Sequence, residues 1–327
     1  MAHPIWQDYI LTIALQSGET YADFSVSYSG SLIYEGRAYA RPGEATIATK
    51  INDICADYLA NALPSVFPRA GAEVQPSEFL FTVDVVTENG TESATFVLFL
   101  YDWTFDYSRD YTTTPPILTA PILRKIQRTA PLLFTATSDT TPIVRIYNAN
   151  GERIEEYATA EANNVIDLSA IVVDTDTEVA ICDDTEEIVR YKLTDCTRYA
   201  LYYLNALGGW DMLTIEGKEI QADNYTRHTI GHTYDNNQSR NRGTRNYRND
   251  IVRKWQLRTL WIDDAGAQNM HHLLGSVDVY LYDSREGALY PITINNNQCE
   301  YKTYANQGNQ LVRYDIEATI ATNITRQ

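Results

Sequence analysis

Residues 79–101 read FLFTVDVVTENGTESATFVLFLY, and this stretch decides the fold class. Two runs of strand-forming residues, 79–86 and 95–101, flank a Glu-Asn-Gly turn at 88–90. Asn and Gly both tolerate positive φ, so Asn-Gly between two apolar runs is a strong signal for a tight hairpin. The stretch therefore predicts two antiparallel strands.

The same signals recur on both sides of this hairpin. Residues 6–15 and 24–28 alternate apolar and polar side chains with the period of two that a half-buried strand requires. Short strands are predicted downstream at 132–135, 143–147, 165–168, 179–182 and 188–193, and again at 252–261, 277–282, 288–294, 299–304 and 311–320. The fold class is therefore mainly β, and strands at this spacing are typical of a β-sandwich.

Two short helices stand out against this background. Apolar residues at helical spacing predict one helix from Ile51 to Leu63, which Pro64 ends. The second is predicted from about Asp264 to Leu274, with Asp263 or Asp264 as its N-cap and a glycine at its far end.

Three domains are predicted from the changes in composition. A Pro-rich stretch at 112–116 separates an N-terminal β domain with one helix (1–115) from an acidic β-sandwich domain (116–196). A C-terminal β domain (197–327) carries a basic arm and the second helix. The length of 327 residues fits two or three domains, each with its own core.

Charge is distributed very unevenly along this chain of net charge -17. Residues 139–195 hold 14 acidic and 4 basic side chains, whereas residues 225–258 hold 8 basic and 2 acidic ones. The net charge argues against a general nucleic-acid binder and against an anionic-membrane binder, because both need a basic surface. The 24 tyrosines are typical of strands and interfaces.

The basic segment around residues 235–248 has almost no aliphatic side chains, so it predicts a long polar loop or a projecting arm. Docking on the acidic face of an identical subunit is the favoured interpretation. A solvated loop and a nucleic-acid contact remain as alternatives. The predicted interface residues are Arg240, Arg242, Arg245, Tyr247 and Arg248.

No pattern predicts catalysis, a cofactor or a metal. The sequence contains no P-loop, G-x-S-x-G, Rossmann or H-E-x-x-H motif. His228 and His232 are four apart, but their β-branched neighbours predict a strand, on which the rings lie too far apart for one ion. The four cysteines lack the close spacing of a zinc site or a disulfide framework.

The stretch YALYYLNALGGWD at 199–211 predicts a structural turn. Gly208 and Gly209 permit a tight reversal after a Tyr-rich strand. Trp210 is expected to anchor the turn on the core, and Asp211 to cap backbone amides.

This stretch also resembles a motif of virion structural proteins of tailed bacteriophages, especially phages of gut anaerobes and their prophages. Two other segments resemble the same proteins: IYEGRAYARP at 33–42 and EYKTYANQG at 300–308. The strand–helix–strand unit from 252 to 320 is similar to the module of phage tail-tube, distal-tail and baseplate-hub proteins, in which a β-sandwich or split barrel carries one flanking helix.

The resemblance implies a non-enzymatic tail, distal-tail or baseplate-hub protein that forms a ring with identical copies and contacts other virion tail proteins. It implies synthesis in the bacterial cytoplasm and a final location in the virion, with no membrane and no cofactor. A receptor-binding or glycan-binding β-sandwich protein, such as an adhesin or tail-tip protein, is the first alternative. A glycan-degrading enzyme is the second, because its paired carboxylates leave no motif.

Overall fold

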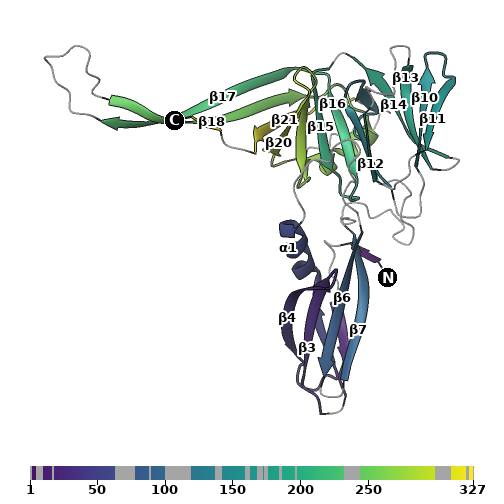
Figure 1. Cartoon of the computed structure of the whole chain (residues 1–327), viewed down its shortest axis with the longest axis vertical. Coiled ribbons are helices and arrows are strands. Elements are labelled where there is room, and N and C mark those ends of the chain that lie inside the picture. Colours follow the sequence, from purple (N-terminus) through teal and green to yellow (C-terminus); the bar gives the residue numbers. More distant parts are fainter. Residues whose placement is uncertain are drawn as a thin grey trace, which may run out of the picture.

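The computed structural model describes residues 2–4, 10–16, 18–62, 78–87, 90–99, 119–136, 142–158, 163–167, 172, 176–183, 186–195, 197–231, 244–298, 311–321 and 324–326. The protein is mainly β, and most of its neighbouring strands pair antiparallel. This confirms the predicted multi-domain β-sandwich class. Figure 1 shows its elements along the chain.

The described residues between 2 and 99 build one five-stranded sheet and a covering layer. The sheet has the order β1 (Ala2–Pro4), β7 (Gly90–Phe99), β6 (Glu78–Thr87), β3 (Tyr21–Tyr28) and β4 (Ser31–Tyr39). The strand pair β2 (Ile10–Ala14) and β5 (Thr46–Lys50) and the helix α1 (Asn52–Ala62) pack on one face. Strands β6 and β7 pair from Phe99 to Gly90, which confirms the hairpin predicted from 79–101.

The acidic segment forms a second five-stranded sheet. Its order is β11 (Arg153–Ala158), β10 (Pro142–Asn148), β13 (Asp176–Asp183), β14 (Glu186–Thr194) and β8 (Lys125–Gln127). A small pair of strands, β9 (Pro131–Thr135) and β12 (Asn163–Asp167), lies beside it. We call the five-stranded assembly the acidic sheet.

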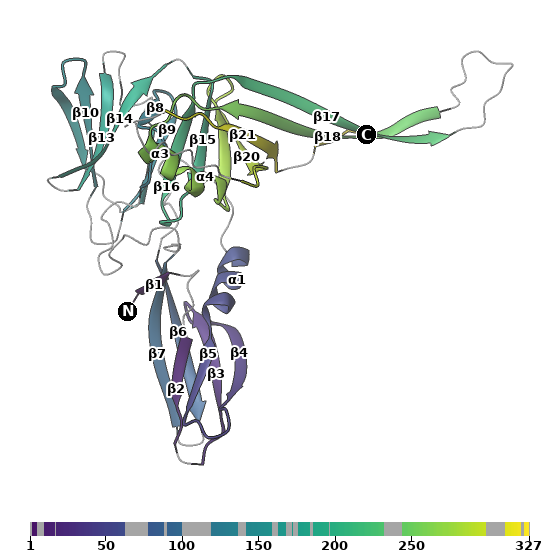
Figure 2. The same cartoon turned by 180° about the vertical axis from the view of Figure 1, so that it is seen from behind.

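The C-terminal sheet has eight strands. In order these are β16 (Trp210–Ile215), β15 (Tyr199–Leu204), β19 (Val279–Asp283), β20 (Ala288–Ile294), β21 (Asp315–Ile320), β18 (Thr244–Arg258) and β17 (Glu219–Gly231), with β22 (Ile324–Arg326) on β18. The helices α3 (Asp264–Gln268) and α4 (Met270–Leu274) lie against one face of this sheet, as Figure 2 shows.

The C-terminal sheet is buried on both faces where β15, β16 and β19 meet. Alternate residues such as Leu201 and Leu281 pack on α4 through Met270 and Leu273. The intervening residues, including Tyr202 and Met212, share a second core with Val144 and Ile181 of the acidic sheet. This second core crosses residue 196, so the acidic sheet and the C-terminal sheet form one packed body, which we call the head. The three domain boundaries themselves stay a prediction.

Both helices lie where the sequence placed them, with one difference. Asp263 is the N-cap of α3, and its side chain accepts a hydrogen bond from the Gly266 amide. Gly275 follows the last residue of α4. The segment from 264 to 274 is divided at Asn269, whose side-chain amide donates to the carbonyl of Pro121. In the last predicted strand, 311–320, the strand begins only at Asp315. The strand predicted at 299–304 lies outside the described residues.

Candidate assembly interface

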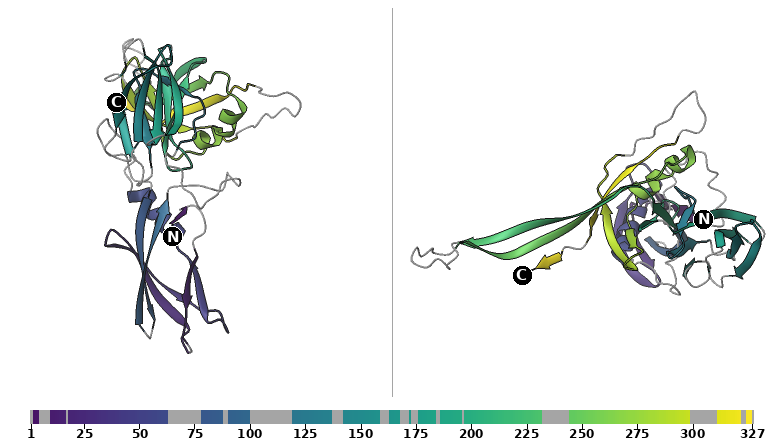
Figure 3. Two further views of the ribbon diagram at one scale, coloured as in Figure 1. Left: turned by 90° about the vertical axis from the view of Figure 1, so that its right-hand side faces the viewer. Right: turned by 90° about the horizontal axis from the view of Figure 1, so that it is seen from above.

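The outstanding feature of the head is a long two-stranded ribbon made by β17 and β18, which have 13 and 15 residues. Their register runs from Glu219 opposite Leu257 to Gly231 opposite Thr244. Figures 1 and 3 show the ribbon leaving the body and projecting into solvent. We call it the arm. Its tip, with Arg240 and Arg242, lies outside the described residues.

Some charged side chains of the arm form ion pairs within it. Arg253 pairs with Asp223 across the two strands at 2.8 Å. Asp250 accepts from both Arg248 and His228, each at 2.8 Å. The hydrogen bonds from Arg248 and His228 lower the pKa of the Asp250 carboxyl, so this carboxylate stays ionised in ordinary buffers. Arg248 is therefore already paired within its own chain.

Three other cations of the arm have no hydrogen bond or ion pair among the described residues: Arg227, Arg245 and Lys254. Large apolar side chains lie exposed between them. Tyr225 is 58% exposed, Tyr247 56% and Ile230 48%. The register shifts between His228 and Thr229, so Tyr247 has no register partner on β17 and occupies a β-bulge, with its ring 6.1 Å from the His228 ring between centroids. The arm thus presents aromatic, aliphatic and unpaired basic groups together.

Three of the described carboxylates on the acidic sheet face a cation. Arg190 binds Glu178 and Glu187 and lies 4.0 Å above the Tyr147 ring, and Arg145 binds Glu156. Glu155, Asp183 and Glu186 have no ion pair or side-chain hydrogen bond among the described residues. The edge strand β11 also exposes Ile154 by 52%. The surplus negative charge is therefore concentrated at a few positions.

The turn predicted at Gly208 and Gly209 connects β15 to β16. Gly208 has φ +82, the left-handed region in which glycine is favoured. The turn's own amides are capped by Asn205, whose Oδ1 accepts from the Leu207 and Gly209 amides at 2.9 and 3.0 Å. Sequence reasoning missed Asn205, although Asn two residues before a reversal is a known turn-capping signal.

Trp210 and Asp211 hold the turn to distant parts of the head. Trp210 is 9% exposed, lies in the core shared with the acidic sheet, and contacts the Tyr280 ring with centroids 6.0 Å apart. Asp211 accepts from the Ala120 amide at 2.8 Å and from Thr119 Oγ1 at 2.5 Å. Through these contacts the motif holds residues 119 and 120, where the chain enters the head, against the C-terminal sheet.

The Asp211 carboxyl is buried, and burial raises its pKa even though Thr119, Ala120 and Asn205 all donate to it. The neighbouring tyrosines of β15 are buried as well: Tyr202 donates to the carbonyl of Pro131 at 2.5 Å. These tyrosines pack within the head and do not face a partner. The motif from Gly208 to Asp211 therefore stabilises the head.

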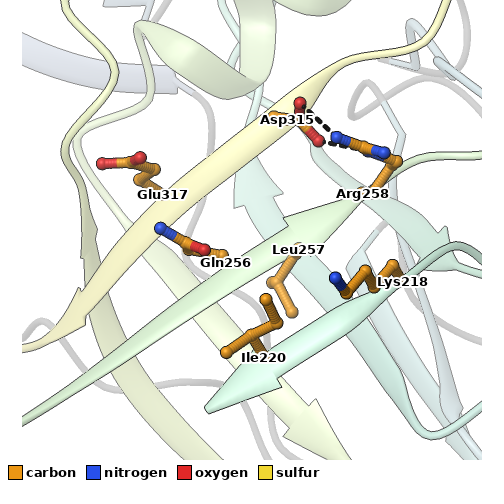
Figure 4. Close-up of a pocket in the computed structure, with 7 residues that line it drawn as sticks. All are labelled: Lys218, Ile220, Gln256, Leu257, Arg258, Asp315 and Glu317. Atoms are coloured by element: carbon orange, nitrogen blue, oxygen red, sulfur yellow. Dashed lines mark hydrogen bonds and ion pairs between the residues drawn. The ribbon is translucent and has the colours of Figure 1, made fainter. Parts of the chain in front are cut away.

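A shallow groove of about 250 Å³ lies on the outer face of β17, β18 and β21. Figure 4 shows its lining, with the two-pronged pair between Arg258 and Asp315 on one side. Among the described residues, no three His, Cys, Asp or Glu side chains come together as a metal site. Within that same part of the chain, no helix is both long enough and apolar enough to cross a membrane.

No family model matches this chain, and no curated protein does. Among solved structures it is similar to the BSP domain of a biofilm associated protein (12% identity, 60% of this chain and 29% of that chain, TM-score 0.18). It is also similar to the four N-terminal Ig domains of Dscam1 isoform 7.44 (15%, 59% and 42%, 0.24) and to Drosophila OTK extracellular domains 3–5 (8%, 78% and 89%, 0.26). The chain spans less than half of the first two. These TM-scores are too low to bear on function.

Proposed function

We propose that this chain is a non-enzymatic structural component of a tailed-phage virion that assembles through its arm into a ring, as a tail, distal-tail or baseplate-hub protein. The resemblance of residues 33–42, 199–211 and 300–308 to such proteins supports the virion assignment. The partners are identical copies in the ring and other virion tail proteins.

The single observation that carries the proposal is the arm. A ribbon of this length that exposes Tyr225, Ile230 and Tyr247 far from its own core leaves apolar surface and an open strand edge in water. Natural proteins cover or blunt such edges because they otherwise pair with other chains. The unpaired cations next to these side chains would fix the orientation in which the arm binds another copy.

The test compares the full chain with a variant whose arm is shortened. Arg227 and Asn249 are register partners, so replacing residues 228–248 by Asn-Gly closes the ribbon with a two-residue turn. We expect rings or short stacks of the full chain in negative-stain images, and monomers of the shortened variant with unchanged thermal unfolding. A full chain that stays monomeric at high concentration, or a shortened chain that assembles equally well, would refute the proposal.

A second candidate function, glycan or receptor binding, is favoured by the N-terminal sheet. Its face opposite α1 is uncovered by any described element, and it carries Tyr21 directly opposite Tyr39 with ring centroids 6.1 Å apart. Tyr39 is 68% exposed, and the Arg37 guanidinium lies 4.2 Å from the Tyr21 ring centre. Ser25, Asp84 and Ser93 continue this face across three strands.

Flat aromatic rings beside hydroxyl and carboxylate groups suit a sugar, which has both apolar and polar faces. A glycan array probed with the full chain tests this candidate. We expect any bound glycan to be lost on Tyr39→Ala and kept on Tyr225→Ala, which removes another exposed tyrosine, from the arm. Equal loss in both variants would contradict a site on this face.

A further inference from the structure

The arm and the acidic sheet lie at opposite ends of the head. In Figures 1 and 2 the ribbon of β17 and β18 points away from one side of the head, while β10, β11 and β13 form the other side, and the view from above in Figure 3 agrees. Both are fixed to the same body, the arm through the ladder of β18 with β21 and the acidic sheet through the shared core. An arm therefore points away from the acidic sheet of its own chain.

Strand β11, the free edge of the acidic sheet, presents a small apolar spot among carboxylates. Ile146 pairs with Glu155 and Tyr147 with Arg153, so Ile154 has no partner on β10 and occupies a bulge. Its exposed fraction of 52% is large for an isoleucine. Its neighbours on β11 are Glu155, which has no ion pair among the described residues, and Arg153, which pairs with Glu156.

The arm carries the complementary arrangement. Tyr247 occupies the bulge of β18, and Arg245 and Arg248 flank it. Arg248 binds Asp250, whereas Arg245 has no ion pair among the described residues. Each surface thus has one large exposed apolar side chain at a bulge. Close to it on the same strand lies one charged side chain without an ion pair among the described residues, Glu155 on β11 and Arg245 on the arm, and these two charges are opposite.

We infer that the arm of one copy docks on β11 of the next copy, with Tyr247 covering Ile154 and Arg245 facing Glu155. The inference rests on the proposed function, because it names the partner surface of the same arm. The two surfaces differ and lie at opposite ends, so the contact is head-to-tail, and repeating it generates a ring or an open filament. Burial of the two apolar side chains supplies attraction, and the charges set the register.

A charge exchange across the two surfaces tests this pairing. Arg245→Glu on the arm and Glu155→Arg on β11 change exposed positions, so each variant should keep its fold, which near-ultraviolet circular dichroism checks. Sedimentation velocity then gives the self-association constant. Each single variant is expected to associate at least about tenfold more weakly than the wild type, since a like-charge contact replaces an attractive one.

The mixture of the two variants is the decisive sample. In a head-to-tail contact, the unchanged arm of Glu155→Arg meets the unchanged β11 of Arg245→Glu, and the two reversed surfaces also match each other. Equimolar mixing should therefore restore association, and so should the double variant. The matched controls are Arg41→Glu and Glu44→Lys, exposed residues of the N-terminal unit, which make similar changes in net charge and should leave association unchanged.

The outcomes separate this inference from the proposed function. If Arg245→Glu impairs association while Glu155→Arg associates like the wild type, or if mixing fails to restore association, the arm docks elsewhere and the inference is overturned while assembly through the arm stands. If the wild type is monomeric throughout, both fall.

Discussion

Replacing Asp211 by alanine should destabilise the head substantially, whereas replacing it by asparagine should not. The carboxylate accepts three hydrogen bonds, from Thr119 Oγ1 at 2.5 Å, the Ala120 amide at 2.8 Å and Asn205 Nδ2 at 2.6 Å. In Asp211→Ala the buried Ala120 amide and the buried Asn205 Nδ2 both lose this acceptor. Each buried donor that loses its acceptor costs about 1–3 kcal/mol, so the free energy of unfolding should fall by about 2–6 kcal/mol.

Asparagine at this position keeps the same hydrogen-bonding capacity. Its carbonyl oxygen can accept from Ala120 and Asn205, and its amide can donate to the Thr119 hydroxyl, which rotates to accept. The substitution also removes a buried negative charge. We expect the free energy of unfolding of Asp211→Asn to lie within about 1 kcal/mol of the wild type.

The pH dependence gives this prediction an independent check. Burial raises the pKa of Asp211, so the folded chain binds the proton more tightly than the unfolded chain does. The stability of the wild type should therefore fall, relative to Asp211→Asn, as the pH rises from the ordinary carboxyl pKa through the raised one.

Urea unfolding of the wild type and both variants at several pH values measures these differences, and hydrogen exchange of the Ala120 amide reports the local contact. Exchange at Ala120 should be fast in Asp211→Ala and slow in Asp211→Asn. Equal stability of the alanine variant and the wild type would refute the role of Asp211 as the fastening of residues 119 and 120.

Further predictions concern a turn, a thiol and the assembly contact. Gly208→Ala places a Cβ at φ +82, so urea unfolding should show a loss of about 1 kcal/mol, and an unchanged midpoint would contradict the need for glycine there. Cys55 is fully buried and burial raises its pKa to about 12, so iodoacetamide should leave it unmodified in the folded chain and label it in urea; rapid labelling without urea would contradict this burial. Association through the arm should weaken as sodium chloride is added, because at 0.1 M salt exposed charges more than about 10 Å apart are largely screened from each other. Sedimentation that does not change with salt would exclude charge-guided docking.

Most of the fold could be predicted from local patterns in the sequence. The hairpin of β6 and β7 follows from residues 79–101 alone, because alternation and turn chemistry act between near neighbours. The capping of α3 by Asp263 is equally local. In contrast, the break at Asn269 depends on a hydrogen bond to Pro121, which is distant in sequence. No period within 264–274 could reveal it.

The site was predicted only in outline. The basic composition of residues 225–258 indicated an arm, but not that Arg248 is already paired with Asp250 while Arg245 has no ion pair among the described residues. Arg248 and Asp250 meet because alternate residues of β18 share one face, whereas the bond from His228 to Asp250 depends on the register of β17 with β18. The tyrosines of β15 are buried because α4 covers one face of their sheet and the acidic sheet the other, and composition alone cannot show that double coverage.

Sedimentation velocity of the full chain and of the arm-shortened variant, across a wide range of concentration, is the decisive test of assembly through the arm. Assembly through the arm predicts that the full chain shifts to larger species as concentration rises, with discrete rings in negative stain, while the shortened chain remains monomeric and folded. Identical sedimentation of the two chains as monomers would contradict it.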